Sequence, residues 1–208
     1  MKKLYFFAFL AMSFFATAQS GNGVGDGIFR YGISLKAHQS NIRGIHQYSK
    51  MRIAGAGGVF VEIPFVQRLS SSTFVVPMVE YSMEGEENEP ETGREKFHND
   101  YVNGLVYIKH FFGARGLNDP KVFVFLGPKL SYNISQKTDA EITDPVIQTA
   151  EDSLEDVQIG ISFGGGYRFA RNIEAYIRWD NGFNPVYINY PYGTFNYQLG
   201  AGINILFR

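Results

Sequence analysis

The chain contains no cysteine, so neither a disulfide framework nor a cysteine-ligated metal site is available to it. It also has little net charge. Its 19 lysines and arginines oppose 20 aspartates and glutamates, for a formal charge of −1, which argues against a nucleic-acid-binding surface. After the first 18 residues, no uninterrupted apolar run reaches the length of a transmembrane helix. If the chain enters a membrane, we expect it to do so with strands.

Residues 1–18 have the pattern of a secretory signal peptide. Lys2 and Lys3 form a basic start, residues 4–15 are an apolar segment, and Ala16-Thr17-Ala18 is a cleavage site of the A-x-A type. The apolar segment is too short to cross a bilayer as a helix. We therefore expect the mature chain to begin at Gln19.

The mature chain is expected to have a flexible, glycine-rich lead over residues 19–27 and a single domain over 28–208. Glycine and aromatic residues are abundant, with 23 Gly, 13 Tyr and 19 Phe, a mixture that favours closely packed strands over helices.

Residues 193–208 show the strand pattern most clearly. One face carries Phe195, Tyr197, Leu199, Ala201, Ile203, Ile205 and Phe207, and the other carries Asn196, Gln198, Gly200, Gly202 and Asn204. Alternation with a period of two is typical of a β-strand, because successive side chains point to opposite faces. The length and the aromatic residues at both ends suit a tilted strand crossing a bilayer, which needs about 9–11 residues.

The same alternation occurs seven more times along the chain. We expect strands over residues 28–38, 51–68, 73–84, 101–112, 121–135, 157–169 and 173–180. The connections alternate between long and short: 39–50, 69–72, 85–98, 113–120, 136–156, 170–172 and 182–192. This rhythm is typical of a membrane barrel with long extracellular loops and short periplasmic turns. We therefore predict an all-β fold, an eight-stranded antiparallel up-and-down transmembrane β-barrel of the cell outer membrane.

The composition of the polar faces favours a membrane barrel over a soluble barrel or sandwich. In a soluble fold the apolar faces would point inward and the polar faces would meet water. They are rich in glycine, which leaves room inside a narrow lumen but serves nothing on a wet surface. They also carry a nearly balanced set of charges that could pair with one another. We expect a lumen charge network of Arg30, Lys36, Glu62, Glu80, Lys109, Lys129, Arg168, Glu174, Arg178 and Asp180.

Three segments resemble the PorT-like group of small outer-membrane β-barrel proteins, similar in plan to OmpA- and OmpX-type barrels. They are Tyr31-Gly32-Ile33-Ser34-Leu35-Lys36 with Gln39-Ser40-Asn41, Phe125-Leu126-Gly127-Pro128-Lys129-Leu130-Ser131-Tyr132, and Leu199-Gly200-Ala201-Gly202-Ile203. The resemblance covers the whole mature chain. It implies contact with outer-membrane lipids and lipopolysaccharide, insertion by the barrel-assembly machinery and, as in some relatives, support of protein secretion through secretion-system components.

One pair of residues suggests catalysis. His38 and Ser40 are two residues apart and so share a strand face, an arrangement similar to PagL-type lipid A deacylases, and Glu62 could orient the histidine. In that family, however, the motif lies late in the chain. We therefore expect no enzymatic activity and a structural or interaction role, with a lipid-modifying hydrolase as the alternative. A small-solute channel is a third possibility, which the size of an eight-stranded barrel disfavours.

No metal or cofactor site is expected. His46, His98 and His110 lack the spacing of metal ligands. The acidic segments 84–91 and 139–144 lack the ordered ligands of a calcium loop, and no glycine-rich phosphate loop precedes a helix. We expect both acidic segments to be solvated loops, too charged to pack.

Overall fold

The computed structural model describes residues 29–43, 49–65, 72–88, 95–113, 121–140, 154–187 and 193–207. The expected signal peptide and the lead over 19–27 lie outside these residues. No helix long and apolar enough to cross a membrane occurs among the residues described. The described strands are β1 Arg30–Arg43, β2 Ser49–Lys50, β3 Arg52–Pro64, β4 Thr73–Asn88, β5 Glu95–Phe111, β6 Lys121–Ala140, β7 Val157–Ala170, β8 Ile173–Gly182 and β9 Phe195–Phe207.

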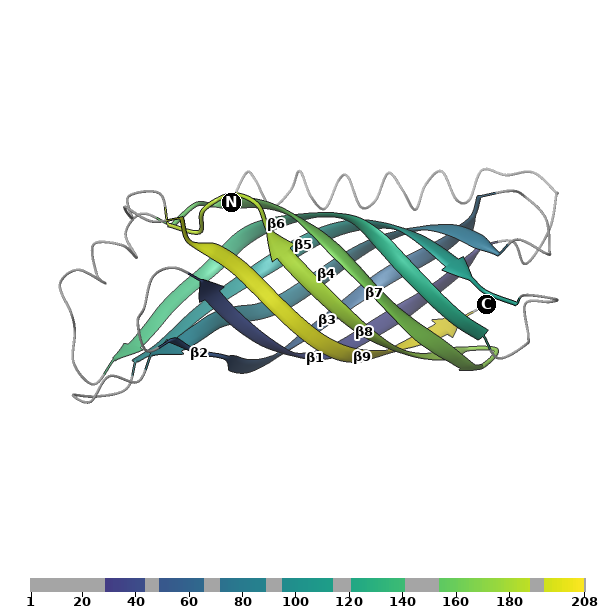
Figure 1. Cartoon of the computed structure of the whole chain (residues 1–208), viewed down its shortest axis with the longest axis horizontal. Coiled ribbons are helices and arrows are strands. Elements are labelled where there is room, and N and C mark those ends of the chain that lie inside the picture. The colour runs from purple at the N-terminus through teal and green to yellow at the C-terminus, as the bar shows by residue number, and fades with distance from the viewer. Residues whose placement is uncertain are drawn as a thin grey trace.

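The eight long strands form a closed antiparallel barrel (Figure 1). Neighbours along the chain are neighbours in the sheet, and β1 closes the barrel by pairing with β9 from Tyr31↔Phe207 to Arg43↔Phe195. The two-residue β2 continues the line of β3 along β4. The predicted eight-stranded antiparallel barrel is therefore confirmed. Closure gives each long strand a partner on both sides, which removes the open edges that a membrane does not tolerate.

The two ends of the barrel differ. The end where β1 begins and β9 finishes, here called the terminal end, carries the two-residue turn between β7 and β8 and lies at the right of Figure 1. The opposite end, called the loop end, carries the connection 141–156 between β6 and β7 and the connection 183–194 between β8 and β9.

At the loop end, the strands continue well beyond the lengths expected from the sequence. Residues 85–88 and 95–98 are strand and not solvated acidic loop, because β4 continues to Asn88, β5 begins at Glu95, and the two strands pair from Thr73↔His110 to Asn88↔Glu95. Glu84 and Glu86 point inward and are at most 1% exposed. The physical reason is the presence of partners. The Lys129 ammonium lies 3.1 Å from the Glu84 carboxylate, and the Arg52 guanidinium donates to the Glu84 carbonyl oxygen at 2.8 Å.

Pro77 interrupts one ladder within β4. The β3–β4 pairing runs from Ala56↔Ser82 to Phe60↔Met78 and resumes at Ile63↔Val75, so the residues opposite Pro77 are not paired. Proline has no N–H to donate, and a gap in the ladder is the expected result. On its other side Pro77 is paired with Val106 of β5, and the barrel stays closed.

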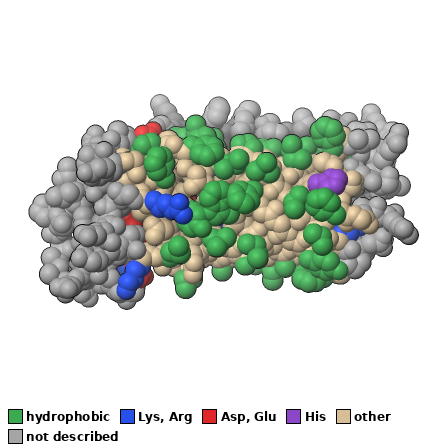
Figure 2. Space-filling view, viewed as in Figure 1, with side chains coloured by type: hydrophobic (Ala, Val, Ile, Leu, Met, Phe, Trp, Pro, Cys, Tyr) green, Lys and Arg blue, Asp and Glu red, His purple; other side chains and the backbone are tan. Residues whose placement is uncertain are grey.

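The outer surface is apolar around the middle of the barrel, and the charged side chains visible in Figure 2 lie towards its ends. Aromatic side chains mark both borders of this band. Tyr31 and Phe207 meet at the terminal end, with ring centroids 6.5 Å apart, and Trp179 meets Tyr197 near the loop end at 5.8 Å. Between Tyr197 and Phe207, β9 spans about 25 Å along the barrel axis at the usual rise and tilt, which is the height of the apolar band of an outer-membrane barrel.

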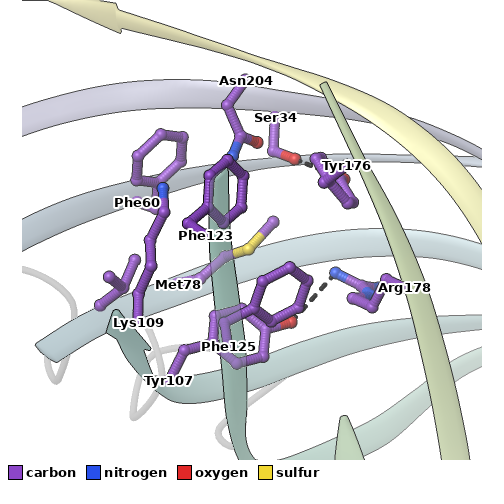
Figure 3. Close-up of a pocket in the computed structure, with 11 residues that line it drawn as sticks. Ser34, Phe60, Met78, Tyr107, Lys109, Phe123, Phe125, Tyr176, Arg178 and Asn204 are labelled. Carbon is purple, nitrogen blue, oxygen red and sulfur yellow. Dashed lines mark hydrogen bonds between the residues drawn. The ribbon is translucent and has the colours of Figure 1, made fainter. Parts of the chain in front are cut away.

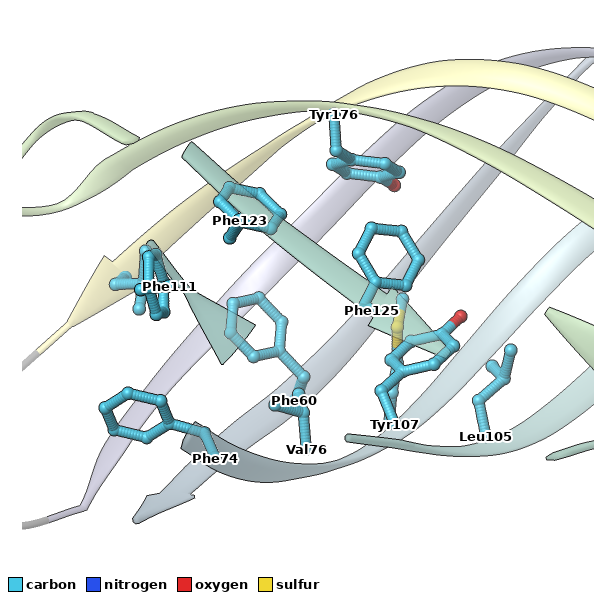
Figure 4. Packing of buried hydrophobic residues seen from close by; sticks show 11 residues of the cluster. Phe60, Phe74, Val76, Leu105, Tyr107, Phe111, Phe123, Phe125 and Tyr176 are labelled. Carbon is cyan, nitrogen blue, oxygen red and sulfur yellow. The ribbon is translucent and has the colours of Figure 1, made fainter. Parts of the chain in front are cut away.

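Inside the barrel, aromatic rings lie over glycines of neighbouring strands. A Cβ placed on Gly32 of β1 would come within 2.6 Å of the Phe60 ring of β3, and one on Gly166 of β7 within 2.5 Å of the Phe123 ring of β6. The rings belong to a buried cluster that Figure 4 shows across the lumen. The glycines of the polar faces thus make room for rings in a narrow interior.

Candidate functional site: the filled lumen

All ten residues of the expected charge network lie in the lumen, and none is more than 9% exposed. Each has an oppositely charged partner among the other nine. The structure groups them into two layers separated by aromatic side chains. The alternation of each strand directs these side chains into the lumen. Along β1, for example, buried and more exposed residues alternate, and the buried set contains Arg30 and Lys36.

The layer nearer the terminal end contains Arg30, Glu62, Lys109, Arg168 and Glu174. The Lys109 ammonium lies 2.7 Å from the Glu62 carboxylate and 2.6 Å from that of Glu174. Arg168 contacts the same two carboxylates, at 2.9 Å to Glu62, and Arg30 reaches Glu62 at 3.9 Å. Three cations therefore share two carboxylates.

Cation–π contacts with aromatic rings stabilise two of the cations of this layer. The Lys109 ammonium lies 4.3 Å from the centroid of the Phe123 ring, and the Arg168 guanidinium lies 4.2 Å from that of Phe111. Such contacts stabilise a desolvated cation by about 2 kcal/mol.

The middle of the lumen is filled by Phe60, Met78, Tyr107, Phe125 and Tyr176 (Figure 3). The Tyr176 and Ser34 hydroxyls are 2.8 Å apart, and the Arg178 guanidinium donates to the Tyr107 hydroxyl at 3.1 Å. The cavity left between these side chains has a volume of about 30 Å³. This cavity has room for one or two water molecules, not for a solute.

The layer nearer the loop end contains Lys36, Glu80, Lys129, Arg178 and Asp180. Arg178 lies 2.6 Å from the Glu80 carboxylate and 3.0 Å from that of Asp180. Lys36 lies 3.1 Å from Asp180, whose other carboxylate oxygen accepts from the Ser162 hydroxyl at 2.6 Å. With Glu84 included, this layer has three cations and three carboxylates.

The loop end is covered by an apolar group of Ile42, Val186 and Tyr187, each no more than 2% exposed. Thr194, just before β9, fixes the group in place. Its hydroxyl accepts from the backbone N–H of Val186 at 3.2 Å and from that of Tyr187 at 2.9 Å. The lumen is therefore occupied from the terminal end to the loop end.

Sequence reasoning missed several members of the lumen. Glu84 and Glu86 continue the inward alternation of Glu80 and Ser82 on β4. Glu84 is the last residue of the strand expected over 73–84, and the period of two could have identified Glu86 had that strand been extended. Lys121 precedes Phe123 at the same period and is 5% exposed. Lys121 is the first residue of the strand expected over 121–135, but it was not included in the expected charge network. For Glu86, the density of charge argued for a loop.

His38 and Ser40 share the lumen-facing side of β1, as their spacing predicts, but they make separate contacts. The His38 Nε2–H donates to the carbonyl oxygen of Met83 at 2.9 Å, and the Ser40 hydroxyl accepts from the Gly85 N–H at 3.0 Å. Glu62 does not orient the histidine. It pairs with Arg30 in the β1–β3 register, about 25 Å along the strand from His38, and binds Lys109 and Arg168.

The other histidines also lie apart. His110 is on the outer side of β5, 2.8 Å from the Thr73 hydroxyl, and His46 is outside the described residues. Within the described ranges, no group of three or more histidine, aspartate or glutamate side chains is arranged to hold a metal ion.

The fold can be compared with known proteins. No curated protein matches the chain. Three solved structures are similar to it: Ail, the attachment invasion locus protein of Yersinia pestis, in complex with the heparin analogue sucrose octasulfate (9% identity, 86% of this chain, 99% of that chain, TM-score 0.43); Neisserial surface protein A (10%, 88%, 99%, 0.45); and OprG from Pseudomonas aeruginosa (7%, 86%, 95%, 0.46).

A family model described as an outer membrane protein beta-barrel domain matches residues 18–188, which include β1 to β8. This match covers most of the chain and agrees with the apolar outer surface and the polar interior. The protein is therefore located in the cell outer membrane, and the chain belongs to the outer membrane protein β-barrel domain family.

Proposed function

We propose that the protein is a closed, non-conducting and non-enzymatic barrel that has a structural or interaction role at the membrane surface. The observation that carries this proposal is the continuous filling of the lumen by paired charges, rings and the apolar group of the loop end. In this proposal the loop end faces the exterior, because long connections are extracellular and short turns periplasmic in bacterial barrels.

Conductance across planar bilayers tests the closed lumen. The reconstituted mature protein is expected to give no steady conductance, because a solute would have to displace buried ion pairs whose disruption costs several kcal/mol. A sixteen-stranded porin, whose wider barrel encloses an aqueous channel, serves as the positive control in the same bilayers. Steady nanosiemens-scale openings from folded protein would contradict the proposal.

The proposed partners are outer-membrane lipids and lipopolysaccharide around the apolar band, and the barrel-assembly machinery during insertion. The resemblance to PorT-like proteins adds a more specific proposal, that the barrel supports protein export by contacting secretion-system components. Deletion of the gene followed by quantitative proteomics of the culture medium tests it. Loss of secreted proteins supports an export role, and an unchanged secretome contradicts it.

The alternative function is lipid modification by His38 and Ser40 in the manner of PagL-type hydrolases. The separate contacts of the two side chains support the non-enzymatic proposal. His38→Ala is expected to leave the acylation pattern of lipid A unchanged in mass spectra of membranes from cells that express it. The loss of a deacylated species in that variant, with folding intact, would favour the enzyme instead.

A further inference from the structure

A row of side chains crosses the outer surface near the loop end. It begins with Phe163 of β7 and continues through Trp179 of β8 and Tyr197 of β9, with ring centroids 4.5 and 5.8 Å apart. The row ends at Arg43 of β1, whose guanidinium carbon lies 4.3 Å from the centroid of the Tyr197 ring. Four neighbouring strands thus hold one continuous row of contacting side chains on the outer surface of the barrel, with successive rings inclined at 59° and 68° to one another.

Arg43 is exposed and has no acidic partner among the described residues. Lys96 of β5, at the same end of the barrel, instead lies 3.7 Å from the Glu87 carboxylate. The guanidinium carbon lies over the Tyr197 ring, and the N–H donors of a guanidinium lie in one plane. Their fork geometry matches a phosphate group bidentately. The Tyr197 ring therefore orients a cation whose donors are available to an anion.

The depth of Arg43 identifies the anion. Tyr197 forms the border of the apolar band at the loop end, and Arg43 is paired with Phe195, two residues further outward on β9. Below the guanidinium, β1 presents Asn41 and Gln39 on its outer side, and Leu199 of β9 beside them is 42% exposed. Deeper on the same strand, Ala37 and Leu35 are exposed, Leu35 at 57%. A molecule that binds here meets a cation at headgroup level and aliphatic side chains at acyl-chain level. These are the two halves of an anionic lipid.

We propose that Arg43, held over Tyr197, binds the phosphate of an outer-leaflet lipid, namely a phosphorylated glycolipid of the lipid A class. The ammonium of Lys96 is excluded from this role by its carboxylate partner. The proposal depends on the orientation given under the proposed function, in which the loop end faces the exterior.

Trp179 offers a local reporter, since it is the only tryptophan of the chain and lies beside Tyr197. The experiment titrates the folded mature protein in neutral detergent with bis-phosphorylated lipid A and follows Trp179 fluorescence. A saturable change is expected with this lipid and none with its dephosphorylated form. Inorganic phosphate at the same concentration should leave the titration unchanged, because it lacks the acyl chains.

Variants of Arg43 and Lys96 test which residue binds the phosphate. Arg43→Gln should weaken lipid binding about fivefold, the contribution of one basic residue near an anionic membrane surface. Arg43→Lys should be intermediate, because it keeps the charge but loses the planar fork. Lys96→Gln is the matched control and should bind like the wild type. Folding of each variant is verified by the difference in gel mobility between boiled and unboiled samples.

Equal binding of the dephosphorylated lipid would overturn the proposal, as would wild-type affinity in folded Arg43→Gln or an equal loss in Lys96→Gln. These outcomes are distinguishable from failure of the proposed function. The closed lumen is tested by conductance, which does not depend on Arg43. Thiol labelling of intact cells that express Arg43→Cys tests the orientation separately.

Discussion

At the scale of single residues, Glu62 shows how the lumen holds charges in the middle of a membrane protein. Its carboxylate is fully buried and accepts contacts from three cations, with Lys109 at 2.7 Å, Arg168 at 2.9 Å and Arg30 at 3.9 Å. Glu174 supplies the second carboxylate of this layer and contacts Lys109 and Arg168. Loss of Glu62 would leave three buried cations with one carboxylate.

Glu62→Gln is therefore expected to destabilise the folded barrel by about 3–5 kcal/mol, as when one partner of a buried ion pair is removed. The measurement is urea unfolding in lipid vesicles. Glu87→Gln is the matched control, because its partner Lys96 has a side chain 39% exposed, and such a pair contributes about 1 kcal/mol or less. Similar midpoints for the two variants would mean that the Glu62 contacts do not stabilise the fold.

At the scale of strands, the packing of rings over glycines determines which residues fit in the lumen. Gly166→Ala would place a Cβ 2.2 Å from the Ala175 carbonyl oxygen and 2.5 Å from the Phe123 ring, and it is expected to cost about 1–3 kcal/mol through overpacking. Gly104→Ala is the control, because its Cβ would meet nothing nearer than 3.9 Å. Unfolding midpoints in the same vesicles compare them.

Combining Gly166→Ala with Phe123→Leu should recover part of the loss, since leucine leaves the space that the ring occupied. If Gly166→Ala is as stable as Gly104→Ala, the ring does not need the glycine.

The strands also show which structural features could be predicted from the sequence and which could not. Alternation placed the ten charged residues on the polar faces, and β7, expected over 157–169, is observed at Val157–Ala170. Strand ends at the loop end were missed, because β4 continues through a run of glutamates that alone would repel. Their burial depends on Lys129 and Arg52, from other strands. Contacts between distant segments decide such ends, and the local sequence does not contain them.

At the scale of the whole molecule, the barrel has its apolar side outward and its polar side inward. Exposed side chains in the apolar band include Ile177 at 62% and Ile203 at 51%, whereas Arg178 and Asp180 inside are 2% exposed. This inverted arrangement is stable only where lipid replaces water around the barrel. The filled lumen, the aromatic borders and the proposed lipid site at Arg43 all depend on this arrangement of faces.

The most direct test compares two adjacent residues of β9. Ile203 is on the lipid-facing side near the middle of the band, and Asn204 is on the lumen side, where it donates to the Glu174 carboxylate at 2.9 Å. Ile203→Arg should cost about 2–4 kcal/mol, the range for arginine on the lipid face at the bilayer midplane. Asn204→Asp removes the donor to Glu174 and adds a second carboxylate beside it, but it should cost less than Ile203→Arg, because Lys109 and Arg168 contact the Glu174 carboxylate and offset part of the repulsion.

Folding into lipid vesicles, followed by gel mobility of unboiled samples, measures both variants side by side. The expected result is that Ile203→Arg folds poorly while Asn204→Asp folds clearly better. Efficient folding of Ile203→Arg together with failure of Asn204→Asp would contradict the assignment of lipid and lumen faces, and with it the account of a filled membrane barrel.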